Sequence, residues 1–277
     1  MPNRSLRALV TASLVAVVFA TALSASHSWG GYHWARTTPQ FTLKLGDNLT
    51  TSSWRGHLAQ TSSDWNSGNS AVLTAIIAGQ SSKRCSMVAG TTQVCNGTYG
   101  RNGWLGLASI NITGGTHITQ GSAKLNDTYF DTSTYNNPNE REHVMCQEVA
   151  HTFGLDHQST DGTSQNSCMD YFSNTGANAG STLSTKPNAH DFAQLNIIYQ
   201  HLDSTTTVAS LASAAASASE VDDDDPNSWG QLMSQSANGR SSKYERVNRD
   251  GSVTATHVYW TLEAAAACPS CDHRSNR

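Results

Sequence analysis

The segment from Gln147 to His157 constrains the fold more than any other part of this 277-residue chain. Just before it, Glu140 and Glu142 suit the positive end of a helix, and Asn139 is placed to cap that helix. Gly154 is placed to end it, because glycine adopts the left-handed conformation that closes many helices. The chain must therefore contain a helix that stops abruptly and turns back on itself.

Three side chains of this segment are spaced so that one metal ion could contact all of them. Gln147 and His151 are four positions apart, so on a helix they project from the same face. A bend at Gly154 would bring His157 back towards the same ion. Three protein ligands and one open position are typical of a catalytic zinc site, so we expect one zinc ion here.

Glu148 lies beside these ligands and is angled towards a water molecule on the ion rather than towards the ion itself. Its carboxylate could accept a proton from that water and pass it to a leaving amine, which is what peptide hydrolysis requires. The amide oxygen of Gln147 is a poorer zinc donor than imidazole. We therefore expect reduced metal affinity, or a further ligand such as Tyr171 or water.

The same segment resembles the metzincin signature HExxHxxGxxH, with Gln147 in place of the first histidine. Residues 167–171 resemble the methionine-containing turn that follows this signature. The resemblance covers residues 41–202 and implies Met169 as a hydrophobic floor beneath the metal, with Tyr171 near the ion. It implies an α+β metzincin-like fold: a twisted, mostly parallel sheet, an active-site helix behind it and a helical subdomain below the cleft. It also implies a zinc metalloendopeptidase that binds an extended polypeptide along the sheet edge.

Two other functions stay open at this stage. The replacement of the first histidine by Gln147 could have abolished catalysis and left a secreted binding protein with the metzincin fold. A carbohydrate-directed protein is the third hypothesis, since Trp54, Trp65 and Trp104 could stack on sugars. Tryptophan side chains are, however, more often part of a core.

The N-terminal residues are typical of a secretory signal peptide. Arg4 and Arg7 precede an apolar run over residues 8–23, and small residues follow up to Ser26. This run is shorter than the ~20 apolar residues that a membrane-spanning helix needs, so we favour cleavage of residues 1–25 over a membrane anchor. Loss of the two arginines changes the net charge from −4 to −6, which argues against a nucleic-acid partner. We expect a secreted monomer that has no contact with a membrane.

Six cysteines follow the leader, and a secreted protein can form disulfides. Their spacing favours three local pairs: Cys85 with Cys95, Cys146 with Cys168, and Cys268 with Cys271. A Cys146–Cys168 bridge would fasten the metal helix to the methionine turn, whereas metal binding by the two thiolates is the alternative. For Cys268 and Cys271, a terminal disulfide is favoured over a redox-active CxxC motif.

Composition divides the chain into four parts: the signal peptide (1–25), a metalloprotease domain (38–203), a linker rich in Ser, Ala and Asp (204–225), and a tail (226–277). In the domain, periodicity predicts strands over 41–45, 71–78, 106–113 and 117–127, and helices over 53–65 and 188–202. In the tail, residues 243–247 and 253–260 alternate around Asp250 and Gly251, which indicates a β-hairpin. The tail is too short to bury much of a core alone, so it either docks on the domain or hangs loose.

Overall fold

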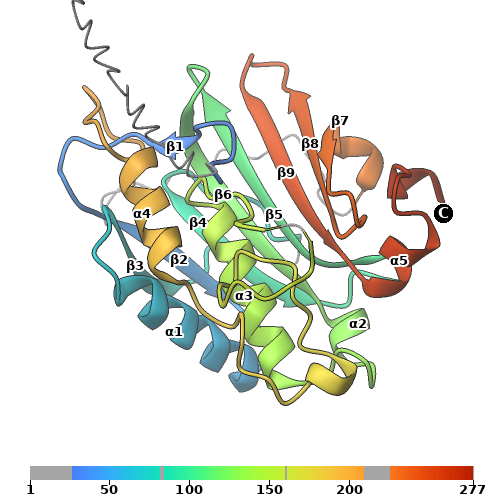
Figure 1. Cartoon of the computed structure of the whole chain (residues 1–277). Helices are drawn as coiled ribbons and strands as arrows, with labels where there is room; N and C mark the ends of the chain where they lie inside the picture. Colours follow the sequence, from blue (N-terminus) through green and yellow to red (C-terminus); the bar gives the residue numbers. More distant parts are fainter. Residues whose placement is uncertain (1–26, 82–83, 160, 209–224, 277) are drawn as a thin grey trace, which may run out of the picture.

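The computed structural model describes residues 27–81, 84–159, 161–208 and 225–276. The predicted signal peptide and most of the predicted linker lie outside these residues. The described chain forms one mixed sheet with its longer helices, α1, α3 and α4, gathered on one face (Figure 1). Among the described residues, we find no helix with the length and apolar character needed to cross a membrane.

The sheet has nine strands, in the order β3-β2-β4-β6-β5-β9-β8-β7, and β1 pairs separately with β6. The strands are β1 (His33–Trp34), β2 (Phe41–Asn48), β3 (Val72–Ala78), β4 (Thr91–Gly97), β5 (Trp104–Thr113), β6 (His117–Asn126), β7 (Gln231–Gln235), β8 (Ser241–Val247) and β9 (Val253–Trp260). Pairing is parallel among β3, β2, β4, β6 and β1. From β5 onwards it is antiparallel, which makes the sheet mixed.

The helices are α1 (Ser52–Asn66), α2 (Asp127–Phe130), α3 (Pro138–His151), α4 (Ala189–Ile198) and α5 (Leu262–Ala267). Short 3-10 turns cover Gly176–Asn178, Pro226–Trp229 and His273–Asn276. Helix α3 begins earlier than expected, because Pro138 occupies its first turn, where the missing N–H leaves no hydrogen bond unmade. Its cap is Asn137 rather than Asn139, and the Asn137 side chain accepts a hydrogen bond from the Glu140 N–H at 2.8 Å.

The tail is part of the main sheet rather than a loose appendage. Strand β9 runs antiparallel to β5 from Trp104 opposite Trp260 to Ile112 opposite Val253, and β8 continues the sheet beyond it. Because strand side chains alternate between faces, Val258 contributes to the apolar cluster on the far face, while Ala255 belongs to the helix-side core. Position 257 therefore faces the helices.

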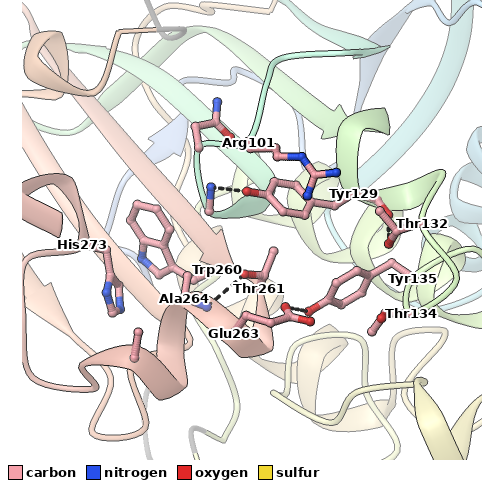
Figure 2. A pocket seen from close by; sticks show the side chains of 13 residues that line it. Arg101, Tyr129, Thr132, Thr134, Tyr135, Trp260, Thr261, Glu263, Ala264 and His273 are labelled. Carbon is pink, nitrogen blue, oxygen red and sulfur yellow. Dashed lines mark hydrogen bonds between the residues drawn. The ribbon is translucent and has the colours of Figure 1, made fainter. Parts of the chain in front are cut away.

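Side-chain contacts fasten the tail at several points. The Tyr32 hydroxyl donates to Glu245 at 2.8 Å, and the Tyr135 hydroxyl donates to Glu263 at 2.5 Å. Figure 2 shows the second contact at the rim of a cavity of about 850 Å³, which lies at the seam between the tail and the residues that precede α3. Trp260 lines this cavity from the tail side, while Tyr129 lines it from the other.

Three disulfides join Cys85 to Cys95, Cys146 to Cys168, and Cys268 to Cys271. Trp54, Trp65 and Trp104 are at most 1% exposed. They therefore form no sugar-stacking surface, which removes the only sequence feature besides secretion on which the carbohydrate hypothesis depended.

Candidate metal centre

Helix α3 is joined to the 167–171 turn by the Cys146–Cys168 disulfide, and every residue from His143 to His151 is buried. Gly154 ends this region with φ of +93°, a conformation that side chains with a Cβ rarely adopt. A Cβ at this position would also lie 1.9 Å from the backbone oxygen of Tyr32. Only glycine fits here, and the reversal that it allows returns the chain so that His157 faces His151.

Three imidazole rings meet at this point: His151, His157 and His257. The ring centroids are 4.7 Å apart for His151 and His157, 3.9 Å for His151 and His257, and 4.6 Å for His157 and His257. One nitrogen from each ring lies within 4.8 Å of the corresponding nitrogens of the other two. The first two residues belong to the predicted site, whereas His257 comes from β9.

The hydrogen bonds of the rings leave nitrogen lone pairs directed into the group. His151 Nδ1 lies 2.8 Å from the backbone oxygen of Leu155 and donates to it, so Nε2 carries the lone pair. His157 Nδ1 lies 2.7 Å from the Tyr171 hydroxyl. The Nε2 atoms of His151 and His157, and both ring nitrogens of His257, are buried without a hydrogen-bond partner. Buried polar atoms normally have partners, and one divalent ion would supply a partner for one nitrogen of each ring.

Burial also favours the neutral imidazole, which is the form that binds a metal. Desolvation lowers the pKa of His157 to about 4, although its hydrogen bond to Asp156 opposes this effect. The pKa values of His151 and His257 are lowered well below the usual histidine range, first by burial and then by the neighbouring rings. Three neutral imidazoles in one place are a donor set that suits zinc.

Glu148 adjoins this group, as its place in the sequence predicts. Its Oε2 atom lies 3.9 Å from His257 Nδ1, and both carboxylate oxygens are buried without a hydrogen-bond partner. Gly106 of β5 makes room for it, since a Cβ there would lie 2.4 Å from Glu148 Oε1. Burial raises the pKa of Glu148 well above its ordinary value.

Gln147, the expected third ligand, has other partners. Its amide nitrogen donates to the backbone oxygens of Cys168 at 2.9 Å and Asp170 at 3.0 Å, so the side chain holds the 167–171 turn against α3. Its Oε1 atom is buried without a hydrogen-bond partner. The structure thus brings a third imidazole, that of His257, to the group formed by His151 and His157.

The 167–171 turn supports the centre in three ways. Cys168 is bonded to Cys146 of α3, so neither sulfur is a free thiolate that could bind the metal. Met169 is fully buried in the helix-side core. The Tyr171 hydroxyl is hydrogen-bonded to His157 Nδ1 and to Ser241 of β8, so in this structure Tyr171 contacts a histidine of the group and the tail at once.

An ion pair orients the tail beside the centre. Lys243 of β8 contacts Asp156, and Asp156 Oδ1 lies 3.5 Å from His157 Nδ1. Burial alone would raise the pKa of Asp156, but the neighbouring His157 and Lys243 outweigh it and hold that pKa well below its usual range. Lys243 is also paired in register with His257 on the adjacent strand, so the Lys243–Asp156 ion pair fixes the position of that histidine. The Trp29 ring packs in T-shaped contacts against His151 and His257, at centroid distances of 5.9 and 6.2 Å.

Sequence reasoning missed His257 because nothing local distinguishes it from a core histidine. The signal that could have found it is indirect: the Gln147–His157 segment is one imidazole short, and position 257 places a histidine in an apolar strand. A donor set that lacks one member favours a search for a buried histidine elsewhere.

Comparisons with known proteins add little to the assignment of the site that this geometry supports. No protein-family profile matches the sequence. No curated protein matches it significantly. Among solved structures, one that matches is high choriolytic enzyme 1, a hatching-enzyme zinc protease from the medaka fish Oryzias latipes. The match covers 61% of this chain and 94% of that one, with 10% sequence identity and a TM-score of 0.34. A likeness at that level carries no conclusion about function, which must come from the residues of the centre.

Proposed function

We propose that this chain is a zinc-dependent peptidase whose metal is held by His151, His157 and His257. One observation carries the proposal: three buried imidazoles from two distant segments converge with their free nitrogens, next to the carboxylate of Glu148. Three neutral imidazoles beside a carboxylate that does not bind the metal are the arrangement of many hydrolytic zinc sites.

In this proposal His257 takes the ligand role first expected of Gln147. Imidazole is a better zinc donor than an amide oxygen, and the Gln147 amide nitrogen holds this side chain to the 167–171 turn. The tail is then a working part of the centre, because β9 supplies one of its three ligands. Met169 and Gly154 retain their expected supporting roles, and Tyr171 acts through its hydrogen bond to His157.

Glu148 is the proposed general base. A bound zinc ion supplies a Lewis acid for the substrate carbonyl and lowers the pKa of a bound water to about 7. The Glu148 carboxylate accepts the proton of the attacking water and then donates it to the departing amine nitrogen, so the residue ends the cycle in its starting state. The site next to Gly106 leaves the carboxylate unhindered by a side chain from β5.

The substrate that we propose is a polypeptide. A peptide cannot add to the edge of β5, because β9 already pairs with that edge along its length. A separate hollow of about 460 Å³ lies between the 162–175 region and the tail, and Tyr171 lines it. We propose that substrate approaches through this hollow, since Tyr171 joins it to His157.

A second function is favoured by a specific observation, the burial of the centre. His151, His257 and Glu148 are 0% exposed, and His157 is 7% exposed. A zinc ion enclosed in this way could serve to lock the tail onto the domain, which would leave a secreted binding protein without catalysis.

The two functions predict different results for zinc-loaded protein. The peptidase should cleave a fluorogenic casein substrate, a chelator should stop cleavage, and Glu148→Ala should abolish it while the variant retains one wild-type equivalent of zinc at the centre. Glu263→Ala is the control, since it removes a partly buried carboxylate contact of the tail away from the centre and should keep activity. Cleavage that persists in Glu148→Ala would refute the peptidase mechanism, and zinc-loaded wild type without turnover would favour the binding protein.

Secretion is proposed on the leader sequence and on three disulfides, which form in oxidising compartments. A monomeric state, and the absence of nucleic-acid and membrane partners, stay predictions from composition alone.

A further inference from the structure

The geometry points to a second metal site, in which His33, His201 and Asp203 bind a zinc-class divalent cation. It lies outside the centre proposed above and does not depend on the peptidase function. His33 is the first residue of β1, while His201 and Asp203 follow α4, so the site would join two segments that are far apart in sequence.

The donor atoms have the spacing of a metal shell. His33 Nε2 lies 3.2 Å from His201 Nε2 and 3.7 Å from Asp203 Oδ1, and His201 Nε2 lies 3.5 Å from the same oxygen. A tetrahedral zinc ion with ligands at about 2.0–2.1 Å holds neighbouring donor atoms roughly 3.3 Å apart. The three atoms therefore surround a point where an ion fits without a change of backbone.

Hydrogen bonds on the outer side of His33 and Asp203 direct the donor atoms of these two residues inwards. His33 Nδ1 lies 2.9 Å from the backbone oxygen of Gly31 and donates to it, which leaves the lone pair on Nε2. Asp203 Oδ2 accepts from the Arg36 backbone N–H at 2.9 Å, which leaves Oδ1 for the ion. His117, paired with His33 in the β1–β6 register, places its Nε2 3.2 Å from that same Oδ1 and acts as an outer partner.

The exposure of the three side chains suits capture of an ion from solution. The His33 and Asp203 side chains are 7% and 9% exposed, but that of His201 is 50% exposed, so the site opens to solvent. Two imidazoles with one carboxylate favour zinc over calcium or magnesium, which prefer shells of oxygen.

The test is a count of metal per chain on the full-length protein, after zinc loading and dialysis, by inductively coupled plasma mass spectrometry. Wild type should hold two zinc ions, and His201→Ala and His151→Ala should each hold one. His201→Ala is suitable because its side chain is half exposed, and Asp203→Asn is a second variant that keeps a partner for Arg36. His57→Ala is the matched control, since His57 pairs with Glu142 and belongs to neither site.

The affinity for zinc distinguishes the metal ligands from His117, their outer partner. His201→Ala should weaken zinc at this site by at least about 100-fold, and His117→Ala by about 10- to 100-fold, the range for residues that orient a ligand. An unchanged metal count in both His201→Ala and Asp203→Asn would overturn the inference. A single ion that His201→Ala removes and His151→Ala does not would support this site and reject the proposed catalytic centre instead.

Discussion

Replacement of His257 is the most informative perturbation of the proposed centre. Structural zinc sites with four protein ligands bind with apparent free energies of about 10–16 kcal/mol, or about 2.5–4 kcal/mol for each donor. Three imidazoles form the donor set here, and His257→Ala removes one of them. At about 1.4 kcal/mol for each tenfold change, the dissociation constant for zinc should rise by between about 10² and 10³.

The same substitution should behave differently without metal. Both ring nitrogens of His257 are buried without a hydrogen-bond partner, so their removal from the metal-free protein relieves an unfavourable burial and partly offsets the loss of packing. His257→Ala should therefore change the melting temperature of the metal-free protein little. Wild type should be stabilised by added zinc, whereas the variant should gain much less at the same concentration, because stabilisation grows with ligand concentration relative to Kd.

The assay is a competition between dialysed protein and a chromophoric chelator, with melting curves recorded with and without zinc. His273→Ala is the matched control, since His273 is another buried histidine of the tail and contacts Gly239 rather than the centre. His257→Asn is available if the alanine variant does not fold. If His257→Ala and His257→Asn bind zinc within threefold of wild type, while Gln147→Ala loses 100-fold, the ligand assignment is refuted.

Two further substitutions test the surroundings of the centre. Gly154→Ala should destabilise the protein by about 3 kcal/mol or more in chemical denaturation, because its Cβ would collide with the backbone of Tyr32. Gly162 has a similar φ but open space around it, so Gly162→Ala should destabilise the protein by only about 1 kcal/mol. Equal effects of the two substitutions would contradict this reasoning. Lys243→Met should weaken zinc binding by about 10-fold, because the Lys243–Asp156 pair positions the strand that carries the third histidine. It should also destabilise the folded protein by about 1 kcal/mol, because the pair is only about one-fifth exposed. An unchanged zinc affinity would show that the ion pair plays no part in this positioning.

The parts of the structure that sequence could predict are those with local signals. The 41–45, 71–78, 106–113 and 117–127 segments alternate or carry apolar runs, and the structure has strands at each place. Boundaries were less exact: α4 ends at Ile198 rather than at residue 202, and α1 begins at Ser52, after its Thr51 cap, rather than at residue 53. Hydrogen bonds of individual caps decide such ends, and several polar residues in a row offer the same cap.

The tail shows what sequence could not supply. Its two strands alternate as a hairpin does, but the pattern contains no information about which edge of the sheet they join. The pairing of β9 with β5 links residues about 150 positions apart, and only the combined packing of both faces selects it. That same pairing introduces His257, so the ligand set was unpredictable for the same reason as the topology.

The placement of the third histidine has a consequence for when such a protein would become active. A centre built from His151 and His157 alone has two imidazoles, and the set is complete only after the chain beyond residue 225 has been made and has docked against β5. Contacts between segments so far apart form late in folding. If the peptidase proposal holds, the protein would hydrolyse peptide bonds only after the whole chain has folded. The incomplete chain and neighbouring proteins would therefore not be cleaved during synthesis.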